Sequence, residues 1–179
     1  MSFNVFFADI YFYTEGDYNY TILTDLIPPT EYCGQMIFDV KAEGNAFIAL
    51  LSGNDDSGPL YEIAFGMNGD TYSVIRKEKI GIANWNREVL KDWDIFLGYK
   101  VVSLFISWNN GTITIGKVGS FNLTWVDPSP LSIKNIAVST AGGLVGEWNF
   151  TTPGKQSVII SSEYNFSNMK YSRELNVHR

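Results

Sequence analysis

Short runs of alternating apolar and polar residues, separated by glycine-rich turns, fill this chain from about residue 35 to residue 151. The clearest run covers residues 60–66, where apolar side chains alternate with Glu62 and Ala64. A period of two is typical of a half-buried β-strand. No sustained amphipathic helix pattern is present in the sequence. The pattern therefore predicts a domain built from β-strands.

The predicted strands follow one another at the spacing of an all-β domain. We expect them at residues 35–42, 46–52, 60–66, 71–77, 101–108, 112–118, 121–126, 133–140 and 146–151, with a first strand near the N-terminus and a further one at 157–164. Asn68-Gly69 and Asn110-Gly111 predict tight hairpins, because this pair supplies the positive φ angles of a type I′ turn.

Residues 82–99 are the least regular part of the sequence. Trp85, Val89, Leu90 and Trp93 could line one face of a short helix there. The predicted fold is thus an all-β, jelly-roll-like antiparallel β-sandwich with at most one short helix. A length of 179 residues suits one domain. We place that domain at residues 1–152 and a C-terminal strand with a tail or linker at 153–179.

Composition narrows the functional classes. Charged residues are only 18% and aromatic residues 15%, a balance that opposes disorder. The formal net charge of −6 argues against a nucleic-acid partner, which requires clustered Lys and Arg. No apolar run reaches the roughly 20 residues of a membrane span. The apolar N-terminus lacks a basic region and is interrupted by Asp9, so we expect no signal peptide in this chain.

Five N-glycosylation sequons favour an extracellular location. They begin at Asn19, Asn110, Asn122, Asn149 and Asn165. The single cysteine, Cys33, excludes an internal disulfide. A buried or idle thiol is the favoured interpretation of Cys33, and a disulfide to another chain is the alternative.

Several short sequence motifs occur one after another along the chain. They are SGPLYEI at 57–63, YSVIRK at 72–77, FISWNNGTITIGKVG at 105–119, TWVDPSPL at 124–131 and GEW at 146–148. Over residues 36–148 the chain thereby resembles the farnesoic acid O-methyltransferase (FAMeT) domain family. The resemblance implies S-adenosylmethionine-dependent methylation of farnesoic acid. The chain departs from the family where it has no tryptophan, in the turn at 66–70 and in the loop at 140–146.

The residues themselves offer little to such chemistry. The glycine-rich segment 142–146 precedes a strand-like stretch ended by Pro153, which favours a hairpin loop over a cofactor cradle. His178 is the only histidine and Cys33 the only cysteine, so the chain lacks the ligands of a zinc site. We expect no cofactor. Asp55 and Asp56 could bind calcium, but a solvated turn is favoured.

Carboxylates and aromatic residues remain as candidates. Glu62 and Glu147 could act as an acid–base pair, although structural roles are favoured. Tryptophans on strands most often pack in the core of a sandwich, and a stacking platform for a sugar ring is the functional alternative. Arg76 lies mid-strand, where it could pair with a carboxylate or contact a ligand. The candidate ligand-binding residues are Asn68, Asp70, Arg76, Trp125, Glu147 and Trp148.

The sequence therefore predicts a non-catalytic, extracellular recognition module with a glycan as its expected ligand. Two alternatives stay open. One is the methyltransferase that the family resemblance implies. The other is a structural protein-interaction domain, in which Cys33 cross-links to a partner.

Overall fold

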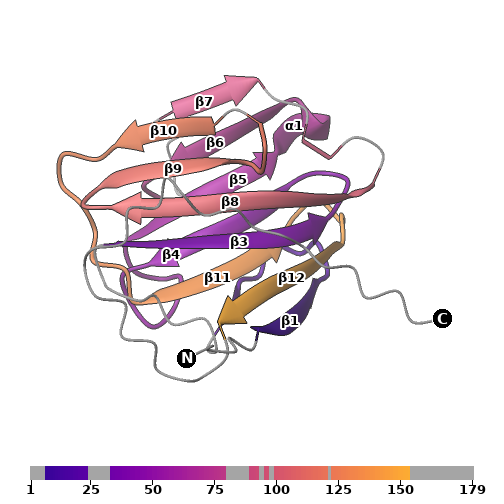
Figure 1. Cartoon of the computed structure of the whole chain (residues 1–179), viewed down its shortest axis with the longest axis horizontal. Coiled ribbons are helices and arrows are strands. Elements are labelled where there is room, and N and C mark those ends of the chain that lie inside the picture. Colours follow the sequence, from indigo (N-terminus) through magenta and orange to yellow (C-terminus); the bar gives the residue numbers. More distant parts are fainter. Residues whose placement is uncertain are drawn as a thin grey trace, which may run out of the picture.

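A computed structural model describes residues 7–23, 33–79, 89–92, 95–96, 99–120 and 122–153. The strands of this part form two six-stranded sheets packed face to face (Figure 1). Sheet A consists, in spatial order, of β1 (Phe7–Thr14), β12 (Gly146–Pro153), β3 (Cys33–Lys41), β8 (Val101–Asn109), β9 (Thr112–Lys117) and β10 (Asn122–Val126). Sheet B consists of β2 (Thr21–Ile22), β11 (Asn135–Thr140), β4 (Ala46–Leu51), β5 (Leu60–Gly66), β6 (Tyr72–Arg76) and β7 (Val89–Asp92).

The architecture is the predicted antiparallel β-sandwich. Every pairing between the described strands is antiparallel. The described part contains one short helix, α1 (Met67–Asp70). No helix in the described ranges is long and apolar enough to cross a membrane.

The main core lies between the two sheets and is rich in aromatic rings. Trp148 and Phe150 of β12 stack with an interplanar angle of 6°, and Phe38 of β3 stacks on Phe150 with ring centroids 5.3 Å apart. All three side chains are at most 1% exposed. They alternate with outward-facing neighbours because successive side chains of a strand point to opposite faces.

Two strands of sheet B are buried on both faces, which differs from the half-buried strand predicted at residues 60–66. All side chains of β4 and β5 are buried. The segment that contains β2 runs along β11, and its Tyr18, Tyr20 and Ile22 pack over the outer side of sheet B. The outer face of sheet B is therefore a second, smaller apolar layer.

The Asn110-Gly111 turn is the predicted two-residue hairpin, since Asn109 pairs with Thr112. The Asn68-Gly69 turn has the predicted positive φ angles but is longer than a tight hairpin, since the pair that closes it is Met67 and Tyr72. Asn68 and Gly69 have φ angles of 54° and 71° within α1, and Asn110 and Gly111 have φ angles of 44° and 87° between β8 and β9. Val89 and Leu90, which could have lined a short helix within residues 82–99, lie in the strand β7. Trp85, Trp93 and the strand expected at 157–164 lie outside the described residues.

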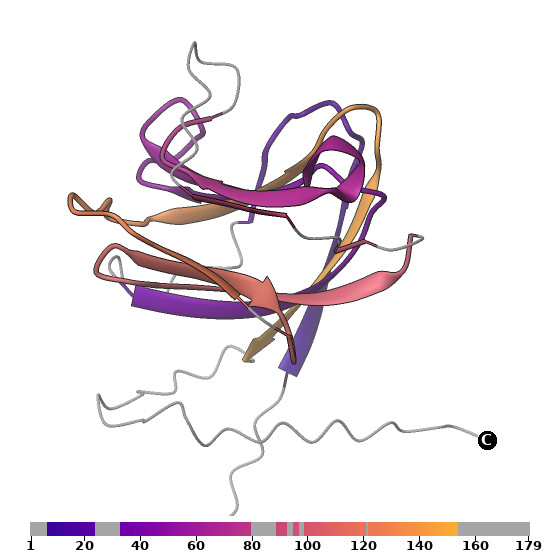
Figure 2. The same ribbon diagram turned by 90° about the horizontal axis from the view of Figure 1, so that it is seen from above.

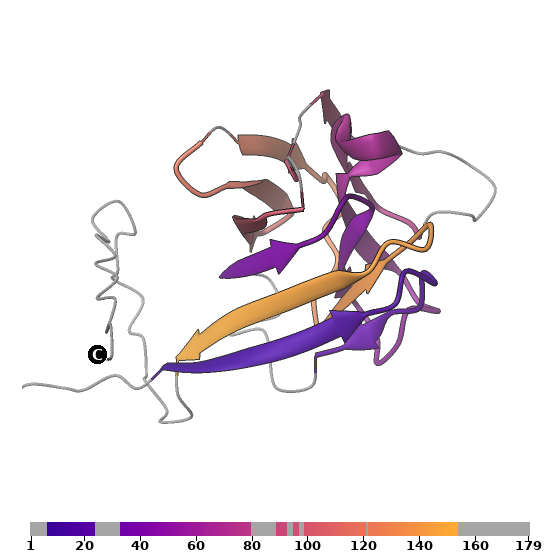
Figure 3. The ribbon, with the colours of Figure 1, turned by 90° about the vertical axis from the view of Figure 1, so that its right-hand side faces the viewer.

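The sheet that carries the candidate site is strongly bent. Figures 2 and 3 show the two layers edge-on, with β1 and β12 running obliquely from the level of sheet B to beyond β3. The loop before β12 contains the glycine-rich residues 142–146 and carries the chain from β11 of sheet B to sheet A. It is thus a connection between sheets, and not the expected hairpin.

Candidate functional site

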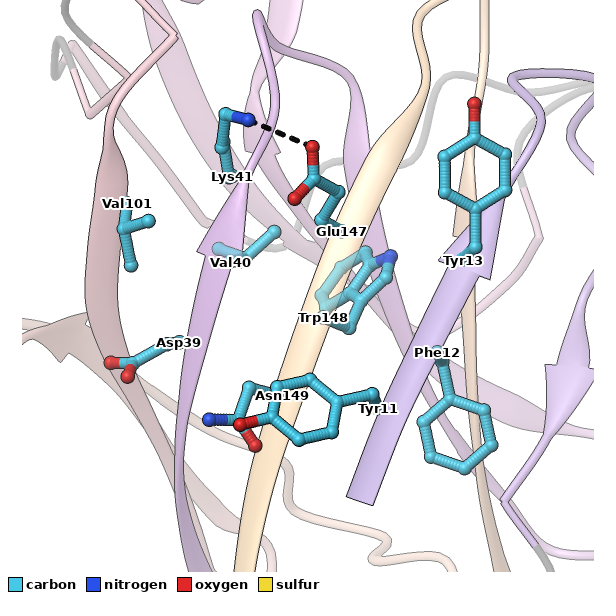
Figure 4. A pocket seen from close by; sticks show the side chains of 10 residues that line it. All are labelled: Tyr11, Phe12, Tyr13, Asp39, Val40, Lys41, Val101, Glu147, Trp148 and Asn149. Carbon is cyan, nitrogen blue, oxygen red and sulfur yellow. Dashed lines mark hydrogen bonds and ion pairs between the residues drawn. The ribbon is translucent and has the colours of Figure 1, made fainter. Parts of the chain in front are cut away.

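An open groove with a volume of about 420 Å³ lies on the outer face of sheet A (Figure 4). Its lining comes from β1, β12, β3 and the beginning of β8. The outward-facing side chains are those of Tyr11, Tyr13, Asp39, Lys41, Val101, Glu147 and Asn149.

The strand register explains why residues distant in sequence meet here. In one row across the sheet, Tyr11 pairs with Asn149, Asn149 with Asp39, and Asp39 with Ser103. The neighbouring row joins Tyr13, Glu147, Lys41 and Val101 in the same way. Residues two apart on a strand share a face, so the two rows form one continuous surface.

Two tyrosines of the edge strand β1 are unusually exposed. The side chain of Tyr11 is 71% exposed and that of Tyr13 is 59% exposed. Phe12 between them points the other way and contacts Phe150 edge-on, with ring centroids 6.0 Å apart. This alternation fixes β1 against the core and presents both phenol rings to solvent beside the groove.

An ion pair closes one end of the groove. Lys41 Nζ donates to Glu147 Oε1 over 2.8 Å and lies 4.5 Å from the centre of the Tyr99 ring. The hydrogen bond from Lys41 lowers the pKa of Glu147, and the same bond raises the pKa of Lys41. Both groups are therefore charged at neutral pH.

Hydrogen-bond acceptors form the floor of the groove. The Asp39 carboxylate accepts a hydrogen bond from the Ser103 hydroxyl. Asn149 Oδ1 is buried, and no residue of the described ranges donates to it. Figure 4 places the Asn149 amide next to the ring of Tyr11. A buried carbonyl oxygen without a donor is costly, so a ligand hydroxyl or amine here would gain a favourable partner.

Two of the predicted ligand residues border this groove. Glu147 faces the groove, where it is held by Lys41. Trp148 also lines it, but the indole is 1% exposed, lies in the core and donates from Nε1 to Thr14 Oγ1 over 3.0 Å. Core packing, the favoured interpretation of the strand tryptophans, is what the structure shows for Trp148.

The other predicted ligand residues lie elsewhere. Asp70 accepts hydrogen bonds from the backbone N–H groups of Ile95 and Phe96 at 3.0 and 2.6 Å, and Asn68 is exposed in the same turn. Trp125 is partly buried and meets the edge of the Tyr61 ring. These positions do not converge on the groove.

Arg76 forms a buried ion pair, one of the two roles predicted for it. Arg76 Nη1 donates to Glu62 Oε2 over 2.9 Å on the outer side of sheet B, and both side chains are at most 2% exposed. The hydroxyls of Tyr18 and Tyr20 donate to the other carboxylate oxygen. Glu62 and Glu147 thus lie on opposite outer faces of the sandwich, and they cannot act on one substrate as an acid–base pair.

The sequon asparagines and the remaining candidates are mostly on the surface. Asn19, Asn110 and Asn122 are exposed, Asn149 lies in the groove, and Asn165 lies outside the described residues. Cys33 is exposed at the beginning of β3, so the buried thiol that the sequence favoured is wrong. The residues of the predicted solvated turn are engaged within the protein, since Asp55 accepts hydrogen bonds from Ser57 and Asp56 pairs with Lys79.

Sequence reasoning did not select Tyr11, Tyr13, Asp39 or Lys41 as ligand residues. The available signal was the alternation Tyr11-Phe12-Tyr13, which places two aromatic rings on one face of a strand. It could not be used, because β1 pairs with a strand more than 130 positions away and the facing side chains were unknown.

A comparison with models of known protein families tests the family resemblance that the sequence motifs indicated. A family model described as farnesoic acid O-methyl transferase matches residues 15–154. The chain belongs to this family. The match is wider than the 36–148 expected from the phrases, and the predicted domain boundary at 152/153 stays a prediction. None of the curated proteins matches the sequence.

Solved structures share the fold at low sequence identity. A beta-fructofuranosidase from Aspergillus kawachii has 11% identity and a TM-score of 0.58, and a fructosyltransferase from A. japonicus has 10% and 0.56. Each alignment covers 84% of this chain but only 27% of the enzyme. A structure described as a native glycosidic hydrolase has 14% identity and a TM-score of 0.52, with 83% of this chain and 80% of that chain covered. These similarities establish the β-sandwich fold.

Proposed function

We propose that this family member is a non-catalytic recognition module that binds a glycan in the groove of sheet A. The observation that carries the proposal is the pairing of two highly exposed tyrosines with a floor of hydrogen-bond acceptors on the same sheet face. A sugar ring has an apolar C–H face and a rim of hydroxyls. It can stack on Tyr11 or Tyr13 while its hydroxyls donate to Asp39 and Asn149.

A hydrolytic role fits these residues less well. Asp39 and Glu147 lie on the neighbouring strands β3 and β12 and on the same face of sheet A, where Glu147 pairs with Lys41, two residues from Asp39. A glycosidase needs one carboxyl group with a raised pKa as its general acid. The ion pair with Lys41 lowers the pKa of Glu147 instead. This argues against Glu147 as the general acid of a glycosidase.

We further propose an extracellular location. The support is the exposure of the sequon asparagines Asn19, Asn110 and Asn122, which gives an attached glycan room to project into solvent. Sugar-processing enzymes contain domains with the same β-sandwich fold, so this fold is compatible with sugar binding. The shared fold does not identify any binding residue of this chain.

A glycan array probed with the 179-residue chain tests the proposal. We expect binding to a restricted set of glycans, and a loss of about tenfold in affinity for Tyr11→Ala, the order of an aromatic contact. Val126→Ala is the matched control, because Val126 is 62% exposed on β10, at the opposite edge of sheet A. A silent array with folded protein would contradict the proposal.

The name of the family supports one second candidate, methyl transfer to farnesoic acid. Calorimetric titration of the protein with S-adenosylmethionine separates the two functions. Glycan binding predicts no heat of binding, whereas a micromolar dissociation constant would replace the proposal with the methyltransferase. A structural role through exposed Cys33 predicts a disulfide-linked dimer on non-reducing electrophoresis.

A further inference from the structure

We infer that the sequon at Asn149 is a modification site that regulates the groove, because an N-linked glycan attached there occupies the groove and closes it to an external glycan. This regulation rests on the proposed glycan-binding function and on the proposed extracellular location. It follows from the place of Asn149 in sheet A, from the side chains beside it, and from the order in which the strands come together.

Asn149 faces the groove from the interior of the sheet. It lies in β12, which has β1 on one side and β3 on the other. Its neighbours Trp148 and Phe150 are each 1% exposed and point into the core. The alternation of a strand therefore turns Asn149 to the outer face, where it lines the groove.

The other sequons within the described residues lie away from the groove. Asn19 belongs to the segment that packs over the outer side of sheet B, Asn110 to the turn between β8 and β9, and Asn122 to the beginning of β10, at the opposite edge of sheet A from β1. All three are exposed. A glycan on any of them projects into solvent and leaves the groove open, so Asn149 differs from them in its consequence.

Tyr11 and Asp39 flank Asn149 across the sheet. Both are its register partners, on β1 and β3, and directly opposed Cβ atoms of antiparallel strands are about 4.5–5.5 Å apart. The buried atom of the Asn149 amide is Oδ1, and Figure 4 shows the amide nitrogen turned toward β3. This nitrogen receives the glycan. The first sugar therefore lies on the groove floor, within reach of the Tyr11 ring.

The modification is a glycosyl transfer from a lipid-linked oligosaccharide pyrophosphate. The amide nitrogen of Asn149 forms a bond with the anomeric carbon of the first sugar, and the bond from that carbon to the pyrophosphate oxygen breaks. The lipid pyrophosphate leaves with the electron pair of the broken bond, and the nitrogen loses one proton. The transfer needs no oxidant or reductant, and residues 149–151 have the N-x-[ST] pattern of its acceptor.

An attached glycan has two advantages over an external one. It takes space in a groove of about 420 Å³, a size that suits one small ligand, and the 71% exposed ring of Tyr11 offers it a stacking surface. A short tether also gives it an effective concentration of about 1 mM. If the tethered sugar binds with a dissociation constant of about 0.1 mM, the apparent affinity for an external glycan falls about tenfold.

Folding limits the time in which Asn149 can be modified. The partners of β12 are β1 and β3, which both end before residue 42, whereas β12 begins at Gly146. Until β12 enters the sheet, its sequon is a free segment that a transferase can bind. Afterwards Asn149 lies on the groove floor between two strands. Modification therefore competes with folding, and we expect a secreted preparation to contain both open and closed molecules.

The test compares two pools of one variant. Thr21→Val, Thr112→Val, Thr124→Val and Ser167→Ala together remove the other four sequons and keep that of Asn149. The 179-residue variant is secreted from insect cells behind a cleavable signal, and a concanavalin A column separates glycosylated from unmodified molecules. Mass spectrometry of the peptide that contains Asn149 verifies the state of each pool.

Two measurements are made on both pools. A glycan array measures binding of external glycans, and nitration by tetranitromethane, which modifies accessible phenol groups, measures whether Tyr11 is covered. We expect the glycosylated pool to bind about tenfold more weakly than the unmodified pool to the glycan with the strongest array signal. Its Tyr11 should also be nitrated more slowly. The same variant produced in a bacterial cytosol without N-glycans should behave like the unmodified pool.

Two substitutions of Thr151 in this variant separate the effect of the glycan from that of the amino-acid change. Thr151→Val removes the acceptor pattern, while it keeps Asn149 and a β-branched residue in the strand, so all of this protein should bind. Thr151→Ser keeps the acceptor pattern and should again give both pools. Melting temperatures identify any variant that is misfolded.

The outcomes distinguish this regulation from the proposed function. If both pools bind the array equally and their Tyr11 is nitrated at the same rate, the attached glycan leaves the groove open, so the regulation is wrong and glycan binding stands. If Asn149 carries no glycan although the wild-type protein, secreted in the same way, is glycosylated at Asn19 or Asn110, the modification site is wrong.

A silent array with the folded, unmodified pool contradicts the proposed function. Slower nitration of Tyr11 in the glycosylated pool would still support occupation of the groove by the attached glycan, and equal rates would refute it.

Discussion

At the scale of single residues, the least expected feature is the buried pair of Glu62 and Arg76. Removing two charges from water is expensive, and their attraction repays the cost only if the remaining polar atoms are also satisfied. Glu62 is well satisfied by Tyr18, Tyr20 and Arg76. Arg76 Nε and Nη2 are buried without a hydrogen-bond partner in the described residues. The pair is thus only partly compensated.

We predict that Arg76→Met alone lowers the free energy of unfolding by about 3–5 kcal/mol, because it leaves the Glu62 charge buried without its partner. The double variant Glu62→Leu/Arg76→Met should recover a large part of this loss, because no charge remains in the apolar layer. Urea unfolding of the wild type, both single variants and the double variant measures the coupling. Additive losses would show that the two side chains do not interact as described.

A second residue-scale prediction concerns Trp148. Its ring lies in the core, so Trp148→Ala should lower the stability by about 3–5 kcal/mol through the lost burial and the cavity. Trp148→Phe should cost less and leave Thr14 Oγ1 without the indole donor. Thermal unfolding measures both changes. A Trp148→Ala protein of unchanged stability would contradict the core assignment.

At the scale of elements, the sequence predicted an element correctly where neighbouring residues determine it, and failed where a distant strand does. The hairpin of β8 and β9 was predictable because Asn110-Gly111 fixes the turn by itself. The strand β7 was not, since the spacing of Val89 and Leu90 suits a helix as well as a strand, and pairing with β6 decides between them. The burial of both faces of β5 depends on Tyr18 and Tyr20, more than 40 positions earlier.

One polar cluster ties β5 to the connection between β10 and β11. The Tyr61 hydroxyl donates to Asp127 Oδ2 over 2.6 Å and accepts from the Leu131 N–H, and Lys77 pairs with Asp127 over 2.7 Å. Burial alone would raise the pKa of Asp127, but the hydrogen bonds from Lys77 and Tyr61 outweigh it and lower this pKa below 3.8. Burial raises the pKa of Tyr61, which stays a donor.

This cluster predicts a contribution to stability that depends on pH. Because the pKa of Asp127 is lower in the folded state, its contribution is complete above the unfolded value of 3.8 and is lost as the pH falls through the folded value. Asp127→Asn should therefore cost about 1–3 kcal/mol at pH 7, with the difference from wild type shrinking below pH 4. Urea midpoints between pH 7 and pH 3 measure it. A difference that is constant with pH would contradict the assignment.

At the scale of the whole molecule, the two outer faces of the sandwich have opposite characters. The outer side of sheet B is an apolar layer under Tyr18 and Tyr20, whereas sheet A presents Tyr11 and Tyr13 to solvent. The chemistry of the groove was visible in the sequence only as separate residues. Its assembly depends on the pairing of β1 with β12 and of β12 with β3, which joins both ends of the domain.

The contrast between the faces predicts which tyrosines react with tetranitromethane, a reagent that nitrates accessible phenolates. Among the tyrosines that the structure describes, Tyr11 and Tyr13 should be nitrated first, because they are 71% and 59% exposed. Tyr20 should resist, since burial and the neighbouring Glu62 carboxylate raise its pKa well above 10.0. Mass spectrometry of tryptic peptides reads the order of modification.

Adding the best-binding array glycan should then protect Tyr11 and Tyr13 without changing the slow reaction of Tyr20, because the first two line the groove and Tyr20 packs on the outer side of sheet B. Unfolding in urea should make all the tyrosines react alike, which provides the control for intrinsic reactivity. If the glycan protects Tyr20 and leaves Tyr11 reactive, the binding surface lies on sheet B and not in the groove. If it protects both equally, the ligand stabilises the whole fold without covering the groove, and the proposed contact with Tyr11 is wrong.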